Sequence, residues 1–133
     1  MDNLVAVYGT LRQNHGNHRI LNKSPLSCEK IFGWSMYSMG GFPGCVKSDG
    51  EADYIVVELY DIDDETLRRL NQLEGYTEGE DNWFYDRVSV GTSLGEAFMY
   101  TWAGSLNQDT RIYHGDWDIH EKENSTWRRI RTR

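Results

Sequence analysis

The chain has 133 residues, of which 38% are hydrophobic, 13% aromatic and 26% charged, and its formal net charge is −7. This length suits a single domain over residues 1–133 with one hydrophobic core, and the composition is typical of a folded protein and not of a disordered one. The negative charge argues against nucleic acid as the main partner, because binding to phosphates needs a basic surface.

The start of the chain and its cysteines bear on its compartment. Residues 1–4 carry no basic segment before an apolar one, which argues against a signal peptide, and no apolar run is long enough to cross a membrane. The two cysteines, Cys28 and Cys45, are too few for a disulfide framework. We therefore expect a cytoplasmic protein with free thiols.

A short strand is predicted at residues 4–8, where β-branched and aromatic residues are frequent. Gly9 ends it, because a residue without Cβ can adopt backbone angles that others avoid. The turn that begins with Gly9 and Thr10 leaves successive backbone N–H groups without a partner in the sheet, and such a turn can bind an anion, most simply a carboxylate. The alternative is an ordinary turn after a first strand.

The next segment predicts a loop and more strands. Residues 13–21 are first polar and then apolar, which indicates a loop leading into one helical turn. Residues 27–39 are typical of strand structure, with a bulge or bend at Gly33. A loop over residues 40–44 precedes a short strand at residues 45–46.

The clearest strand covers residues 52–60, which are dense in β-branched and aromatic side chains. A helix is predicted over residues 63–74, because Asp residues at its start can cap it and complement its dipole. Gly75 is a suitable C-terminal stop. Two further strands, at residues 83–90 and 96–102, surround a turn.

The end of the chain gives a weaker pattern. We expect a short strand near residues 115–117 and a less ordered tail after about residue 118. Many short strands with one clear helix predict an α+β domain with a curled or barrel-like sheet.

Glu74 is a candidate catalytic residue because of its place on the predicted helix. At about 100° per residue, Glu74 falls between Leu67 and Leu70 around the helix axis and so points toward the core. A buried carboxylate without a partner is unfavourable, and burial would raise its pKa and make it a better proton carrier near neutral pH. The alternative is that Glu74, in the last turn, frays outward or caps a neighbour.

Together, an anion-binding turn and an inward carboxylate predict a pocket for a small molecule that carries a carboxylate, with Glu74 transferring a proton on it. This geometry alone does not name the reaction.

Short blocks along the chain carry a family resemblance. They read YGTLR and GNHRIL (8–12, 16–21), GFPG (41–44), VELY (57–60), LNQLEGY (70–76), YDRV and AFMYTW (85–88, 97–102) and GDW (115–117). In this order they resemble the γ-glutamylcyclotransferase-like family, and within it the γ-glutamylamine cyclotransferase and AIG2-like branch. The resemblance covers the chain to about Trp117.

The resemblance implies a small mixed β-barrel-like sheet with one main flanking helix. It also implies a reaction in which a γ-glutamyl amine, or a γ-glutamyl amino acid, is cyclised to 5-oxoproline and the amine is released. The substrate's own α-amino group attacks its γ-carbonyl, so the enzyme needs no nucleophile, metal or cofactor, only orientation of the substrate and one proton carrier.

The resemblance also assigns residues to the site. Glu74 would be the general acid and base. The backbone N–H groups of the turn Tyr8, Gly9, Thr10 and Leu11 would hold the α-carboxylate and the oxyanion. Tyr100 matches a tyrosine whose hydroxyl lines the pocket.

The chain departs from the family pattern in two places. Val57 stands where a Gly is common, which is expected to narrow the local packing. Residues 77–82 form an acidic insertion after the proposed catalytic helix. An acidic rim would favour a cationic leaving amine, such as a lysine side chain or a polyamine, whereas the alternative is a solvated loop.

Other features predict less. The histidine pairs at positions 15 and 18 and at 114 and 120 do not form a recognisable metal motif. The Arg-rich end, residues 128–133, could contact RNA, an acidic partner or the acidic loop, or be solvated.

Two function classes remain open from the sequence. One is an enzyme acting on a small γ-glutamyl substrate, and the other is a non-catalytic binding or regulatory protein that keeps the carboxylate-binding pocket. The sequence names neither the amine half of the substrate nor the oligomeric state.

Overall fold

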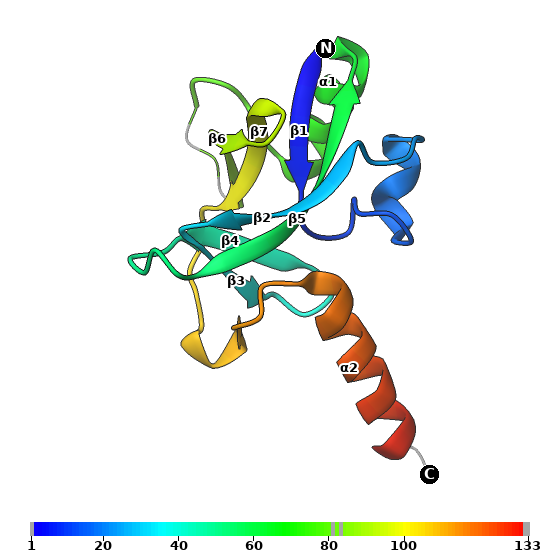
Figure 1. Ribbon diagram of the computed structural model, residues 1–133, viewed down its shortest axis with the longest axis vertical. Coiled ribbons are helices and arrows are strands. Elements are labelled where there is room, and N and C mark those ends of the chain that lie inside the picture. Colours follow the sequence, from blue (N-terminus) through cyan, green and yellow to red (C-terminus); the bar gives the residue numbers. More distant parts are fainter. Residues whose placement is uncertain (1, 81, 83, 132–133) are drawn as a thin grey trace.

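The computed structural model describes residues 2–80, 82 and 84–131, with side chains described to residue 124 (Figure 1). Its elements in chain order are β1 (Asn3–Val7), the 3-10 helix η1 (Gly16–Ile20), β2 (Ser27–Phe32), β3 (Trp34–Ser38), β4 (Pro43–Lys47), β5 (Tyr54–Ile62), α1 (Asp64–Glu74), β6 (Tyr85–Thr92), β7 (Gly95–Trp102), η2 (Gln108–Thr110), β8 (Arg111–Ile112) and α2 (Trp117–Arg131).

The strands form two sheets. The larger has the order β2-β5-β1-β7-β6, and the smaller has the order β4-β3-β8. Strands β1 and β7 run parallel, whereas the other neighbours are antiparallel, so the larger sheet is mixed. The predicted α+β class with a mixed, barrel-like sheet is confirmed, with two sheets in place of one.

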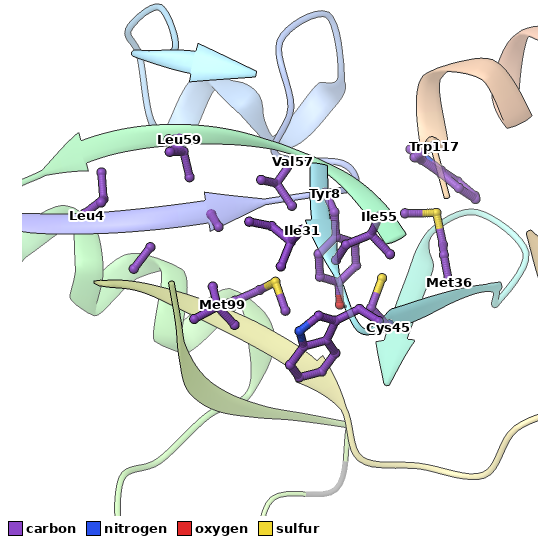
Figure 2. Close-up of a cluster of buried hydrophobic side chains, with 14 of the residues drawn as sticks. Leu4, Tyr8, Ile31, Met36, Cys45, Ile55, Val57, Leu59, Met99 and Trp117 are labelled. Carbon is purple, nitrogen blue, oxygen red and sulfur yellow. Dashed lines mark hydrogen bonds between the residues drawn. The ribbon is translucent and has the colours of Figure 1, made fainter. Parts of the chain in front are cut away.

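Alternating side chains of β1 divide the core into two clusters. Leu4 and Ala6 face a cluster enclosed between the two sheets, together with residues such as Met99 of β7. Val5 and Val7 point to the opposite face and pack against Leu70 of α1. This period of two is the ordinary geometry of a strand that is buried on both faces. Figure 2 shows the first cluster, with Leu4 at one end and Trp117 at the other.

Gly33 divides the strand segment that the sequence predicts at residues 27–39. Its φ of 88° turns the chain sharply, so β2 and β3 lie in different sheets. β2 pairs with β5, and β3 pairs with β4. The predicted bend at Gly33 is therefore a change of sheet.

The predicted helix is confirmed at both ends. Asp63 is the N-cap of α1, and its carboxylate accepts a hydrogen bond from the backbone N–H of Thr66 at 2.8 Å. Gly75 ends the helix in the left-handed conformation, with φ 68°. Both are standard helix signals.

The end of the chain differs from the prediction. The expected strand at residues 115–117 is wrong, because Gly115 has φ 67° and its carbonyl accepts a single bond, at 2.8 Å, from the N–H of Val56. A Cβ at Gly115 would lie 2.1 Å from the carbonyl oxygen of Tyr54, so the chain crosses β5 very closely there. Trp117 is fully buried and begins α2, which continues past residue 118 into the segment expected as a less ordered tail.

Helix α2 extends away from the sheets, as Figure 1 shows. Residues 132 and 133 of the Arg-rich end lie outside the described residues, as does Trp83 at the start of a predicted strand. No helix in the described part of the chain is long and apolar enough to cross a membrane.

Candidate active site

In the turn after β1, hydrogen bonds within the protein are made by the backbone carbonyl groups. The carbonyl oxygens of residues 9, 10 and 11 accept hydrogen bonds, in that order, from the N–H of Arg12 at 3.0 Å, the N–H of Asn17 at 3.2 Å and Nδ1 of His18 at 3.0 Å. A carbonyl can only accept, so Nδ1 of His18 carries the proton. Helix η1 and its flanks therefore fix the carbonyls of the turn.

The N–H groups of the same three residues are free. Among the described residues, none accepts a hydrogen bond from the backbone N–H of Gly9, Thr10 or Leu11. These residues line a cavity of about 500 Å³. Successive N–H groups without partners form a concave surface of partial positive charge that suits an anion.

Gly9 is required for a reason other than the one that the sequence indicated. Its φ is not in the left-handed region. A Cβ at this position would lie 2.7 Å from the ring of Pro43, so a side chain would collide with the start of β4. Gly9 therefore allows β4 to close one wall of the cavity.

The cavity lies between elements that are far apart in the sequence. Its wall combines the end of β1 and the turn, residues 41–43, the end of α1, and residues of β6 and β7. Glu74 is the only charged side chain among the described residues that line it. An anion entering this cavity therefore meets backbone N–H groups and no cationic side chain.

Glu74 points into the cavity from the last turn of α1. Burial raises the pKa of its carboxyl from 4.5 to about 7. Within the described part of the chain, the carboxyl has no hydrogen-bond donor or cationic partner to offset that burial. Leu73, the residue before Glu74, is 42% exposed and lies at the cavity wall.

Three tyrosines surround the carboxyl of Glu74. Burial raises the pKa of Tyr8, Tyr85 and Tyr100 well above the ordinary value, and the charge of Glu74 raises each further. These phenols therefore stay protonated near neutral pH. Unlike these phenols, the Glu74 carboxyl can take up and release a proton near neutral pH.

Two of these hydroxyls form hydrogen bonds with the backbone of the core and cavity wall. The Tyr8 hydroxyl donates to the backbone carbonyl of Tyr100 at 2.7 Å and accepts from the N–H of Cys45 at 3.3 Å. The Tyr85 hydroxyl donates to the carbonyl of Pro43 at 2.7 Å. The side chain of Tyr8 thus belongs to the core, and only its backbone belongs to the turn.

The Tyr100 hydroxyl is oriented by Asn71 of α1. It donates to Asn71 Oδ1 at 2.5 Å, and Arg87 donates to the same oxygen at 3.4 Å. Because a guanidinium can only donate, Arg87 identifies the atom facing it as the amide oxygen. The Tyr100 proton is therefore committed to Asn71, and Arg87 acts on the same hydroxyl.

Asn71 and Arg87 were not among the residues predicted from the sequence. Asn71 lies three residues before Glu74, and this helical spacing places the two side chains on neighbouring parts of one face. That spacing could have identified Asn71. Arg87 comes from β6, and only the tertiary fold brings it to Asn71.

The acidic insertion lies outside the cavity wall. Glu78 and Glu80 are exposed and do not line the cavity, and Asp81 lies outside the described residues. Asn82 closes the loop by accepting from the N–H of Thr77 at 2.8 Å and donating to the carbonyl of Glu80 at 3.0 Å. This arrangement favours the alternative of a solvated loop over an acidic rim.

No metal site is formed by the described residues: they contain no group of three His, Cys, Asp or Glu side chains that could hold a metal ion. His15 instead pairs with Asp118 at 2.5 Å. Cys28 and Cys45 are free thiols, exposed and buried respectively.

Comparison with known proteins places this site in a family. Residues 5–119 match the family described as Gamma-glutamyl cyclotransferase, AIG2-like. A putative gamma-glutamylcyclotransferase from Pyrococcus horikoshii is 36% identical over 86% of this chain and 90% of its own length. Its crystal structure covers 94% of this chain and 98% of its own chain, with a TM-score of 0.77 and 32% identity.

Two further relatives agree with this match. The gamma-glutamylcyclotransferase family protein YtfP of Escherichia coli is 34% identical over 85% of this chain and 94% of its own length. A protein of Niallia circulans named gamma-L-glutamyl-butirosin B gamma-glutamyl cyclotransferase is 34% identical over 75% of this chain and 67% of its own length. The chain therefore belongs to the AIG2-like gamma-glutamylcyclotransferase family and is a gamma-glutamylcyclotransferase-like enzyme.

Proposed function

We propose that this enzyme converts a γ-glutamyl amine to 5-oxoproline and the free amine, with Glu74 as general acid and base. The observation that carries the proposal is the position of Glu74, a carboxyl without a partner among the described residues, in a cavity that is also lined by the turn with its free backbone N–H groups. Membership of a family named for this activity supports it.

The turn would hold the substrate's negative charge. Its free N–H groups, those of Gly9, Thr10 and Leu11, are the partners available for the α-carboxylate and for the oxyanion that forms at the γ-carbonyl. Holding both groups folds the glutamyl chain, so that the α-amino nitrogen approaches the γ-carbon within one molecule.

Glu74 would move two protons, one after the other. It takes a proton from the α-ammonium, and the freed nitrogen lone pair forms the new bond to the γ-carbon. It then gives this proton to the leaving nitrogen as the original amide C–N bond breaks. The attacking nitrogen still carries one proton more than an amide nitrogen, and Glu74 passes this second proton to the released amine. The products are 5-oxoproline and the protonated amine, and the carboxylate is restored. A pKa of about 7 suits both halves of this transfer.

Tyr100 would act as an acceptor. Because its proton is committed to Asn71, its oxygen can accept a hydrogen bond from the α-ammonium or from the leaving nitrogen. In this arrangement Tyr100 orients the nitrogen toward Glu74 and does not itself transfer a proton. The Niallia circulans relative, whose name contains gamma-L-glutamyl-butirosin B, supports a γ-glutamyl compound as the substrate.

The proposal is tested by measuring release of 5-oxoproline from γ-glutamyl-lysine, γ-glutamyl-polyamines, γ-glutamyl amino acids and glutathione. Each compound is incubated with the wild type and with Glu74→Gln, and folding is checked by circular dichroism. Release by the wild type that is lost in Glu74→Gln supports the mechanism. Equal release by both proteins would exclude the role of Glu74, and binding of these compounds without release would favour a non-catalytic binding protein.

A further inference from the structure

Aromatic rings gather at the outer part of the cavity. The Trp102 ring lies 6.2 Å from the Phe42 ring and 6.0 Å from the Phe84 ring, measured between centroids, and all three side chains line the cavity. Phe42 is 39% exposed and Phe84 is 61% exposed. Two phenylalanines exposed beside one indole form an apolar surface that has no role in the core.

The indole of Trp102 is held in one position. A Cβ at Gly44 would lie 2.8 Å from Cβ of Trp102, and a Cβ at Gly104 would lie 2.8 Å from its ring. Its Nε1 donates to the carbonyl of Ser105 at 2.9 Å. Two glycines and one hydrogen bond therefore present a fixed aromatic face, which lowers the entropic cost of binding a ring against it.

The inner and outer parts of the cavity differ in chemistry. The inner part carries the free N–H groups of the turn and the buried carboxyl of Glu74. The outer part carries the exposed rings of Phe42 and Phe84. The charged glutamyl group fits the inner part, so the amine that leaves must extend past the outer part toward solvent.

We propose that Phe42, Phe84 and Trp102 form a subsite for an amine half with an apolar ring, such as an arylalkylamine. The proposal rests on the cyclotransferase function proposed above. Flat rings stack on aromatic side chains in offset or edge-on arrangements, and an apolar body removes the exposed phenylalanine surface from water.

Charge supports a neutral or apolar amine half against an anionic one. Glu74 is the only charged side chain on the described cavity wall, so a second carboxylate on the substrate would find repulsion and no cationic partner there. Phe84 and Trp102 could also attract a cation through their ring faces. The experiment below therefore also includes a substrate with a cationic amine half.

The experiment compares matched γ-glutamyl amides by kcat/KM for 5-oxoproline release. γ-Glutamyl-phenethylamide carries the ring, γ-glutamyl-ethylamide lacks it, and γ-glutamyl-diaminobutane carries a cation in its place. We expect the phenethylamide to exceed the ethylamide by about tenfold or more, chiefly through a lower KM, since the ring adds contacts that persist in the ground state. A preference for the diaminobutane amide over the phenethylamide would overturn the proposal in favour of a cation subsite.

Two variants of exposed phenylalanines provide the control. Phe84→Ser is expected to bring the phenethylamide-to-ethylamide ratio close to one. Phe32→Ser removes a side chain that is equally exposed, at 60%, and that also packs against a neighbouring ring, that of Tyr54 at 5.5 Å between centroids. This side chain does not line the cavity. Phe32→Ser should leave the ratio unchanged. A ratio that survives in both Phe84→Ser and Phe42→Ser would overturn the proposal.

Direct binding separates failure of the subsite from failure of the function. Titration of γ-glutamyl-phenethylamide and γ-glutamyl-ethylamide into Glu74→Gln by calorimetry measures affinity without turnover. If neither amide is converted by the wild type but the phenethylamide still binds about tenfold more tightly, the subsite stands and the cyclotransferase function fails. Equal affinities would reject the subsite whatever the turnover.

Discussion

Two glutamates close to the same turn, one buried and one partly buried, have opposite surroundings. Glu58 of β5 is 5% exposed, and its carboxylate accepts hydrogen bonds from Arg12 Nε at 2.9 Å, the Tyr60 hydroxyl at 2.7 Å and the N–H of Gln13 at 2.8 Å. Glu74 has no such partner among the described residues. The burial of the Glu58 carboxylate is offset by these hydrogen bonds, whereas the Glu74 carboxyl is available to a ligand.

The residues around Glu58 connect several elements of the fold. The Arg12 guanidinium also pairs with Asp116 at 2.9 Å and Asp118 at 3.0 Å. Asp116 in turn accepts from the N–H of Asp118 at 2.9 Å, at the start of α2. Arg12 thus connects the turn, β5 and α2 through ion pairs with three carboxylates.

The comparison teaches how to separate structural from functional buried charges. A buried charge with a full set of partners holds elements together, whereas a buried charge without partners is tolerated only where something else is gained. In this molecule both kinds lie near one turn. The difference between Glu58 and Glu74 can be measured.

The largest expected effect is on catalysis at Glu74. Glu74→Gln should lower kcat for 5-oxoproline release by about a thousandfold, since an amide of the same shape cannot carry the proton. The free energy of unfolding at pH 8, measured with urea, should stay equal or increase, because the buried charge is removed. A large loss of stability would show that Glu74 has a structural role like that of Glu58.

The second effect is on stability at Arg12. Arg12→Leu should lower the free energy of unfolding by about 3–5 kcal/mol, because it leaves Glu58 buried and unpaired. The measurement is urea unfolding followed by tryptophan fluorescence. The control is Arg69→Leu, which removes an arginine that is 61% exposed and 3.5 Å from Glu65. The control should change stability little. Similar losses in the two variants would remove the distinction that we draw for the Arg12 cluster.

The third effect is the pH dependence of the Glu74 site. The pKa of Glu74 is raised from 4.5 to about 7, so the folded protein holds a proton between these values that the unfolded chain has released. The stabilisation is therefore complete below about pH 4.5 and is lost as the pH rises through about 7, by at most about 3 kcal/mol.

Histidines titrate in the same range, so the useful quantity is a difference. We expect the free energy of unfolding of the wild type, relative to Glu74→Gln, to decrease between pH 5 and pH 8. Over the same range kcat/KM of the wild type should rise as Glu74 loses its proton and becomes a base. A flat difference, or a rate that falls as the pH rises through 7, would contradict the raised pKa.

The smallest effect is expected at Tyr100. Tyr100→Phe should lower kcat/KM by about tenfold, the value of one hydrogen bond to a charged group. Asn71→Leu should reproduce part of this loss, since the hydroxyl would no longer be held as an acceptor. If Asn71→Leu retains full activity while Tyr100→Phe does not, the orientation of Tyr100 by Asn71 has no catalytic role.

Local signals in the sequence predicted the elements that this site is built from. The β-branched residues of β1 and β5, the Asp63 cap and the Gly75 stop depend on interactions within a few residues, and those are confirmed. The helical spacing of Glu74 with Leu67 and Leu70 predicted its direction for the same reason. The predicted strand at residues 115–117 is wrong because the close crossing of Gly115 over β5 is a long-range contact.

Short-range patterns in the sequence predicted the family, the helix that carries Glu74, and the turn after β1. The surroundings of these elements follow from contacts in the folded protein. Arg87 and Asn71 reach Tyr100, and Pro43 requires Gly9, through contacts between residues that are far apart in the chain. The structure also decided that Glu58 is compensated and Glu74 is not, since partners for a buried charge come from packing and not from local sequence.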